Sequence, residues 1–262
     1  MIYSFVAFPQ KKINSDSTCT KLNGKYLLSY WHDTKTIVAE PFHWRWKQWG
    51  TTAGIAAIWA VTYSFDDEIY KAVQENRSKG SNNISQYVIE PWGSGMYSIP
   101  LFAGMYVFSK PGSRHKQVAL TGVKAFLITG GATAIAKHMF HRHRPGDNTP
   151  PDPRQWDGPL PLTTNFTSFP SGHTSVSFAM ATVLALGYKD KPWVGITGYS
   201  VAALVGISRI NDGKHWASDV VAGAALGSFI GITLSRINIK NLNLEADFST
   251  PTPGLKLSLH LN

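Results

Sequence analysis

Cysteine is almost absent from this sequence, with Cys19 the one thiol among 262 residues. A lone cysteine excludes an internal disulfide and a zinc site built on cysteines, so we assign Cys19 no role. Charged residues are also scarce, at 16% of the chain, whereas they make up about a quarter of ordinary soluble domains. A chain with so few charges buries much of its surface or faces lipid.

Hydrophobic runs of full membrane-spanning length are lacking as well. Most apolar segments have 12 to 19 residues, and one of them contains Lys124, whereas a helix needs roughly 20 apolar residues to cross a bilayer. The mean hydropathy of −0.12 is also low for a protein made mostly of membrane spans. These features favour a soluble helical domain.

Six apolar segments are nevertheless present, and none shows the alternation of a strand, so all are predicted to be helices. They are Thr51–Phe65, Tyr97–Phe108, Val118–Ala136, Thr174–Tyr188, Trp193–Ser208 and Ala217–Ser235. Small residues within them allow close helix packing, among them Gly122, Gly130, Gly223 and Gly227. The predicted fold class is all-α, a helical bundle of about six core helices.

The regions around the bundle have a different character. We predict a polar, interfacial segment over residues 1–50, a helical domain over 51–240 and a tail over 241–262, in which residues 255–261 alternate like a strand. Residues 1–10 are compatible with the remnant of a secretory signal or with a frayed tail. Residues 41–49 mix cations with three tryptophans, which is typical of a membrane interface or of a surface helix packed on a neighbour.

The net charge of +9 limits the classes of partner. A basic chain suits nucleic acid, an anionic membrane surface or a phosphorylated substrate. The cations lie at helix ends without a recognisable nucleic-acid-binding module, so we expect no nucleic acid partner.

Three short motifs, each at the edge of an apolar segment, carry the candidate chemistry. The first runs from Lys137 to Arg144 and Pro145, the second is Pro-Ser-Gly-His at 170–173, and the third runs from Ser208 to Asp219. The first two are joined by a long loop rich in proline, and such loops are usually functional.

Cations and small residues in these motifs suit a phosphate group. Lys137, Arg144 and Arg209 supply fixed positive charge, with arginine offering a planar fork and lysine a point charge. Ser171 offers a hydroxyl donor, and Gly172 lets the backbone approach an anion at the start of a helix.

The remaining motif residues suit proton and phosphoryl transfer. His215 and Asp219 are four residues apart and share one helix face, so the carboxylate can accept a hydrogen bond from the ring and leave its other nitrogen free to attack. His173, placed across the phosphate, is expected to act as a general acid. A metal site at His138, His141 and His143 is disfavoured, because no carboxylate or cysteine completes it and arginines lie between the histidines.

The combined pattern Lys-x6-Arg-Pro, Pro-Ser-Gly-His and Ser-Arg-x5-His-x3-Asp resembles the superfamily of type 2 phosphatidic acid phosphatases, nonspecific acid phosphatases and vanadium haloperoxidases. The resemblance covers about Val118 to Ser235. It implies a metal-independent phosphatase that forms a phosphohistidine, with His215 as nucleophile, Asp219 as its partner and His173 as general acid. It also implies that the phosphoryl oxygens are held by Lys137, Arg144, Ser171, Gly172 and Arg209, that no cofactor is needed, and that vanadate binds as an inhibitor.

The expected substrate is a lipid phosphate or pyrophosphate, or a small phosphomonoester. Two loops, 110–116 and 188–193, are short and basic, as the positive-inside rule requires of cytoplasmic loops. A six-span protein of the inner membrane, with the active site facing the periplasm, accounts for them. The alternatives are a soluble periplasmic nonspecific acid phosphatase and a vanadium-dependent haloperoxidase.

Overall fold

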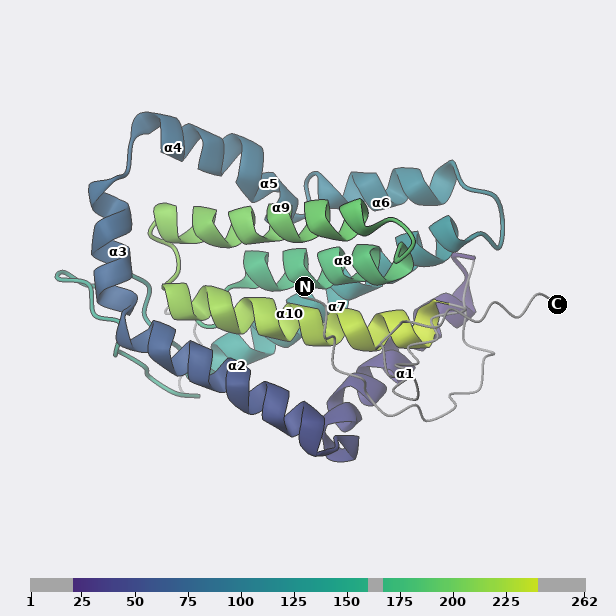
Figure 1. Cartoon of the computed structure of the whole chain (residues 1–262), viewed down its shortest axis with the longest axis horizontal. Helices are drawn as coiled ribbons and strands as arrows, with labels where there is room; N and C mark the ends of the chain where they lie inside the picture. The colour runs from purple at the N-terminus through teal and green to yellow at the C-terminus, as the bar shows by residue number, and fades with distance from the viewer. Residues whose placement is uncertain (1–20, 160–166, 240–262) are drawn as a thin grey trace, which may run out of the picture.

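The computed structural model describes residues 21–159 and 167–239, and regular structure in this part of the chain is helical throughout (Figure 1). The N-terminal third contains α1 (Gly24–Ala39), η2 (Glu40–His43), α2 (Trp46–Ser64), α3 (Asp66–Glu75), α4 (Lys79–Asn83), the π-helix η3 (Ile84–Ile89) and α5 (Glu90–Ser94). The rest contains α6 (Ser98–Val107), α7 (Arg114–Phe140), α8 (Gly172–Gly187), α9 (Pro192–Asn211) and α10 (Ala217–Asn238).

The all-α prediction is confirmed, and all six predicted segments are helices, namely α2 and α6 to α10. The strand-like tail and the possible signal remnant fall outside the described residues, and the domain boundaries stay predictions. The N-terminal segment, predicted to be polar and interfacial, contains the 16-residue helix α1.

Helix α8 lies at the centre of the bundle, packed against α7, α9 and α10 (Figure 1). Glycines permit the closest of these approaches. A Cβ atom at Gly227 of α10 would lie 2.0 Å from the carbonyl oxygen of Ser175 in α8, and one at Gly122 of α7 would lie 2.2 Å from the ring of Phe102. Gly130, expected to serve the same purpose, has open space beside it.

Lys124, which interrupts the apolar run of α7, is fully buried and paired. Its ammonium group lies 2.5 Å from the carboxylate of Asp33 in α1 and also donates to Ser29 and Asn238. A buried charge is tolerated when it is paired and hydrogen-bonded, so Lys124 does not argue against an apolar environment for α7. It ties α1 to α7 and α10.

The bundle has two chemically different ends. Both basic loops lie at one end, where Arg114 at the start of α7 pairs with Asp190 after α8 at 2.6 Å. The three motifs lie at the other end, since they follow α7, begin α8, end α9 and begin α10. This confirms the predicted separation of the basic loops from the catalytic loops.

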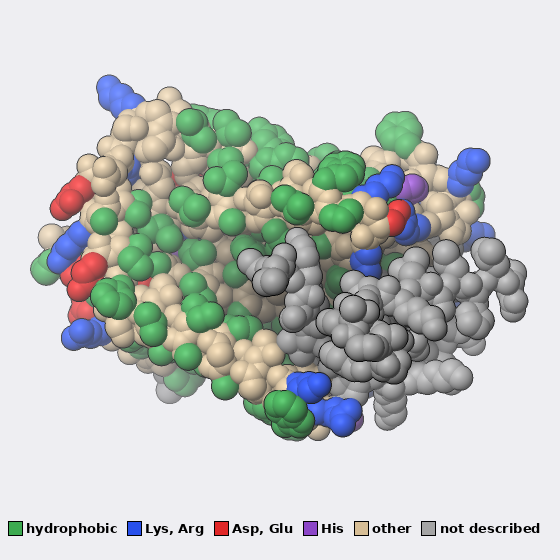
Figure 2. Space-filling view, in the orientation of Figure 1, with side chains coloured by type: hydrophobic (Ala, Val, Ile, Leu, Met, Phe, Trp, Pro, Cys, Tyr) green, Lys and Arg blue, Asp and Glu red, His purple; other side chains and the backbone are tan. Residues whose placement is uncertain are grey.

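Three helices, α7, α9 and α10, are long and apolar enough to cross a membrane. The other three predicted spans, α2, α6 and α8, do not meet this criterion of length and composition, so the six-span topology stays a prediction. Large apolar side chains nevertheless gather on the outer surface of α2 and α9, including Ile58, Val61 and Ile207, each about 60% exposed (Figure 2). Such a surface is suited to lipid.

The packing interpretation of the tryptophan segment is confirmed for Trp44, and the membrane-interface interpretation stays a prediction. Trp44 packs edge-on against Phe229 of α10, with ring centroids 5.6 Å apart. Trp46 and Trp49 are 76% and 53% exposed, as expected of rings at a membrane interface.

Candidate active site

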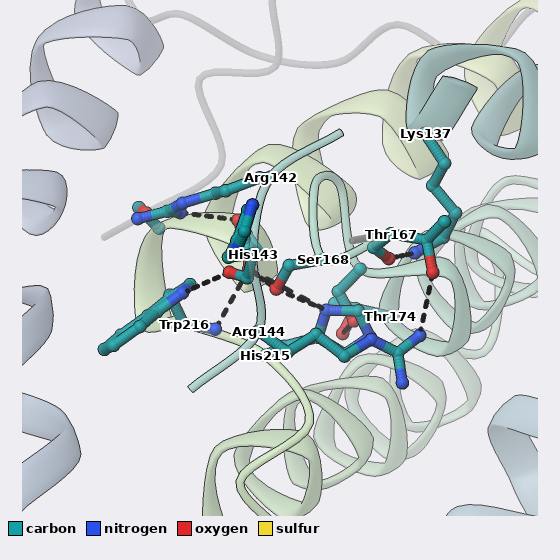
Figure 3. Close-up of polar contacts among 12 residues, drawn as sticks. Lys137, Arg142, His143, Arg144, Thr167, Ser168, Thr174, His215 and Trp216 are labelled. Atoms are coloured by element: carbon teal, nitrogen blue, oxygen red, sulfur yellow. Dashed lines mark hydrogen bonds and ion pairs between the residues drawn. The ribbon is translucent and has the colours of Figure 1, made fainter. Parts of the chain in front are cut away.

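Lys137 and Arg144 approach each other where the long loop leaves α7. The helix ends at Phe140, and His141 takes a left-handed conformation with φ of 40°, which turns the chain away from the helix axis. Lys137 Nζ donates to the carbonyl of Thr167, and Arg144 Nη2 donates to the hydroxyl of the same residue at 3.2 Å (Figure 3). The two predicted phosphate ligands therefore meet at one point.

The second motif lies directly beside Lys137. Helix α8 begins at Gly172, and a Cβ atom at that position would lie 3.8 Å from Lys137 Cε. A side chain at position 172 would thus be in ordinary van der Waals contact with the lysine. The hydroxyl of Ser171 is fully buried and bonded to Thr174 Oγ1 at 2.8 Å, so it is engaged within the helix start.

His215 and Asp219 lie together, although they do not share a direct hydrogen bond as expected. His215 Nδ1 is 3.8 Å from Asp219 Oδ2. The hydroxyl of Ser168 lies between them, donating to Asp219 at 2.6 Å and standing 3.5 Å from His215 Nδ1 (Figure 3). The sequence analysis missed Ser168, which links His215 to the carboxylate of Asp219.

A buried arginine, Arg142, fixes the other oxygen of Asp219. Its guanidinium donates to Asp219 Oδ1 at 2.6 Å and to Asp66 Oδ2 at 2.7 Å. All three side chains are fully buried. Asp66 begins α3 and also accepts from the backbone and hydroxyl of Ser218, so the chain of contacts joins α3, the long loop and α10.

Aromatic rings enclose this guanidinium. Tyr63 and Trp156 each have their ring centroid 4.9 Å from the guanidinium carbon of Arg142, within cation–π range. Arg142 is a spacer residue of the first motif, and Asp66 lies far from all three motifs in sequence. Neither was among the predicted site residues, although the acidic step that follows the apolar run 51–65 was a usable signal.

The third cation, Arg209, lies near the end of α9 on the side of His173. It is 4% exposed and pairs with Asp212 at 2.5 Å. Glu90 of α5 lies 3.2 Å from Arg209 Nη1 and 3.5 Å from His173 Nε2. Glu90 is another site residue that sequence analysis missed.

Electrostatics connect the two imidazoles. The positive charges of Lys137 and Arg144 act on both His173 and His215. Burial, together with these cations, lowers the pKa of His215 to about 3, against the opposing effect of Asp219. The ring of His215 is therefore neutral at physiological pH, as a nitrogen nucleophile must be.

Two of the three histidines near the first motif have polar partners, whereas His138 contacts the ring of His141 and its buried Nδ1 has no hydrogen-bond partner among the described residues. His143 Nε2 lies 2.9 Å from Asp157, and His141 Nδ1 lies 2.6 Å from the carbonyl of Gly158. In the described residues, no group of three or more histidine, cysteine or acidic side chains is placed to hold a metal ion. The absence of a metal or cofactor from the reaction stays a prediction.

Similarity to known proteins agrees with this arrangement. A profile of the PAP2 superfamily matches residues 119–242. The undecaprenyl-diphosphatase of Sulfolobus acidocaldarius is 30% identical over 166 residues, which cover 63% of this chain and 75% of that protein. The chain belongs to the PAP2 superfamily. The lipid A 1-phosphatase of Porphyromonas gingivalis is 42% identical over 105 residues, covering 40% of this chain and 20% of that longer protein.

Two crystal structures of PAP2 proteins share the fold. Aquifex aeolicus LpxE superposes with a TM-score of 0.52 at 23% identity, covering 66% of this chain and 95% of that one. The transmembrane PAP2-type phosphatidylglycerolphosphate phosphatase of Bacillus subtilis has a TM-score of 0.52 at 24% identity, covering 70% and 92%. These matches show the fold, and the three long apolar helices α7, α9 and α10 are compatible with a membrane location.

Proposed function

We propose that this protein is a phosphatase that hydrolyses a lipid phosphate or pyrophosphate through a phosphohistidine intermediate. One observation carries the proposal: Lys137 and Arg144 meet at Thr167, between the two histidines. The next residue, Ser168, has its hydroxyl 3.5 Å from His215 Nδ1, and Gly172, which precedes His173, lies beside Lys137. Positive charge aimed at a transferring phosphoryl group is usually the largest catalytic contribution.

The proposed reaction has two steps. In the first, the neutral His215 attacks phosphorus while His173 protonates the leaving oxygen, so that one P–O bond breaks and one N–P bond forms. In the second, His173 takes a proton from water as the water attacks, and the N–P bond breaks. Asp219 stabilises the charge that develops on His215, acting with the hydroxyl of Ser168.

Several features favour a lipid substrate over a soluble one. The relatives include proteins named for lipid A, undecaprenyl diphosphate and lipid phosphates. An apolar cavity of about 440 Å³ lies among α6, α8 and α9, and Trp92 of α5 lines it. The neighbouring Gly93 packs on His173, so the cavity begins close to the proposed general acid.

The orientation follows from the two ends of the bundle. With the basic loops 110–116 and 188–193 on the cytoplasmic side, the site faces the periplasm across an inner membrane. The proposed reaction uses no metal or cofactor, and vanadate, which mimics the trigonal phosphoryl transition state, is expected to inhibit it.

Phosphate release from a panel of substrates tests the proposal. The panel contains phosphatidate, phosphatidylglycerophosphate, an isoprenyl pyrophosphate, lipid A and an aryl phosphate, assayed on separated membrane and soluble fractions. We expect activity in the membrane fraction, a preference for a lipid, inhibition by vanadate and no loss with a chelator. His215→Ala should lower turnover roughly a thousandfold or more.

A matched control is His43→Ala, because His43 is exposed and bonds only to the backbone carbonyl of Ala39. It should leave turnover unchanged. Near-normal hydrolysis of an aryl phosphate by His215→Ala would refute the phosphohistidine mechanism. Oxidation of a halide by the unmodified protein with vanadate and peroxide would instead identify it as a haloperoxidase.

A further inference from the structure

Glu90 is an isolated carboxylate in an uncharged stretch of the chain. It is the one charged residue between Lys79 and Lys110. It lies outside the three motifs, at the first position of the short helix α5. A single charge in such a stretch needs either solvent or a specific partner.

The partners of Glu90 are two residues of the candidate site. Its Oε1 atom lies 3.2 Å from Arg209 Nη1 and 3.5 Å from His173 Nε2, so one oxygen faces both groups. The side chains of Glu90 and His173 are 31% and 32% exposed. Both are therefore partly open to solvent.

The backbone of α5 is fixed against the same histidine. A Cβ atom at Gly93 would lie 2.8 Å from His173 Cβ and 2.7 Å from Val205 of α9. The hydroxyl of Ser98 also donates to the carbonyl of Trp92 at 3.0 Å. This close packing holds α5, and with it Glu90, at a defined place beside the ring.

We propose that Glu90 is a positioning residue that accepts from the Nε2–H group of His173, and so orients the ring for the general-acid step and favours its protonated form. Burial and three cations, Arg209 from α9, Lys137 from α7 and Arg144 from the long loop, lower the pKa of His173 to about 4. The carboxylate of Glu90 on α5 opposes them. The inference rests on the proposed phosphatase function, because it assigns His173 the general-acid step.

In this scheme the proton on Nε2 has two acceptors in succession. In the free site it points at Glu90, and when the substrate enters, the leaving oxygen replaces the carboxylate as acceptor. The proton then moves from Nε2 to that oxygen as the P–O bond breaks. His173 regains a proton from the attacking water in the second step, which restores the contact with Glu90.

A purely structural role for Glu90 makes a different prediction. If Glu90 only neutralised Arg209, its removal would change phosphate affinity for all substrates alike. If it acts through His173, its removal matters most when the leaving group is poor, since an alkoxide needs the proton and an aryl oxide does not. Comparing the two leaving groups therefore separates the two roles.

The first experiment measures pH profiles of kcat/KM for Glu90→Gln with phosphatidate and with an aryl phosphate. We expect the basic limb to move down by about one pH unit. At pH 7.5 the rate with phosphatidate should fall about tenfold or more, and the rate with the aryl phosphate by less than about threefold. Equal losses with both substrates, or a change confined to KM, would overturn the proposal.

Glu40→Gln is the matched control. Glu40 is 24% exposed and pairs with Arg236 at 3.5 Å, near the end of α10 remote from the site. The control therefore removes a comparable carboxylate and should leave both pH profiles unchanged.

The second experiment does not depend on turnover. The ring of His173 is titrated by NMR in histidine-labelled protein in micelles, with its signal assigned by its loss in His173→Gln. The pKa should be lower by about one unit in Glu90→Gln than in the unmodified protein. An unchanged pKa of His173 in Glu90→Gln would overturn the proposal. If the pKa were lower but the unmodified protein hydrolysed none of the phosphates, only the proposed function would be refuted.

Discussion

The two histidines of the site are held in opposite ways. His215 is 5% exposed, and behind it stand Ser168, Asp219, Arg142 and Asp66 in a continuous buried network. His173 is 32% exposed, and its charged partner Glu90 is 3.5 Å away and as open as the ring itself. We call the surroundings of His215, the proposed nucleophile, the nucleophile side, and those of His173, the proposed general acid, the acid side. The nucleophile side is closed to solvent, whereas the acid side is open to it.

This difference matches the two tasks. A nucleophile must be neutral and aimed at one atom, and burial with fixed partners provides both properties. A general acid must accept leaving groups of different shapes and release them, so its ring has to stay accessible. The comparison predicts that equivalent substitutions destabilise the protein far more on the nucleophile side than on the acid side.

The largest effect is expected for Arg142→Ala. Removal of this guanidinium leaves Asp66 and Asp219 buried without their cation. Breaking a buried ion pair from one side costs about 3–5 kcal/mol, so the free energy of unfolding in micelles should fall by that amount and turnover should be lost. Chemical denaturation followed by tryptophan fluorescence measures the change.

Arg114→Ala is the control for this prediction. Arg114 and Asp190 form an ion pair of similar length, 2.6 Å, but their side chains are 42% and 52% exposed. Exposed pairs contribute at most about 1 kcal/mol, and salt weakens them. If the two alanine variants were equally stable, the network around Arg142 would not be the element that holds the nucleophile side.

A second prediction uses the pH dependence of stability. The pKa of His215 is about 3 in the folded protein, against 6.5 for the unperturbed ring. Between pH 6.5 and pH 3 the ring is therefore protonated in the unfolded chain but neutral in the folded protein. The contribution of the neutral ring to the free energy of unfolding is fully present above pH 6.5 and is lost as the pH falls toward 3. His215→Gln lacks this contribution.

The stability difference between the unmodified protein and His215→Gln should accordingly shrink with acidity. Between pH 7 and pH 4.5 we expect it to narrow by roughly 1–3 kcal/mol. Parallel thermal unfolding of both proteins measures it, and other titrating groups cancel in the difference. A constant gap would mean that the buried ring is protonated as easily as a free one.

The core of the fold was predictable because each apolar helix can be recognised from its own stretch of sequence. The segments that became α2 and α6 to α10 carry long runs of apolar and small residues, and their loops carry proline and charge. The short helices α3 to α5 were not predicted, because α3 is polar and α4 and α5 have only five residues each, so none of them contains a long apolar run.

The candidate site was predictable only where its residues lie in short, ordered motifs. Lys137 and Arg144 meet at Thr167, as their spacing suggested. Arg142 was missed because a charged residue between two motif positions is usually expected to face solvent. Asp66 was missed because it lies 76 residues from its partner Arg142 in the sequence. Such contacts depend on tertiary packing, which brings remote segments together without a local pattern.

The smallest effect is expected for His173→Gln. The ring is one-third exposed and its partner Glu90 equally so, and loss of an exposed charged contact changes stability by less than about 1 kcal/mol. The same change removes the proton donor, so turnover of phosphatidate should fall roughly a hundredfold, with a much smaller loss for an aryl phosphate. Unfolding curves measured beside those of Arg142→Ala test the stability half of the prediction. If His173→Gln lost as much stability as Arg142→Ala, the acid side would be held as firmly as the nucleophile side. Weaker contacts could then not explain why the ring of His173 is accessible.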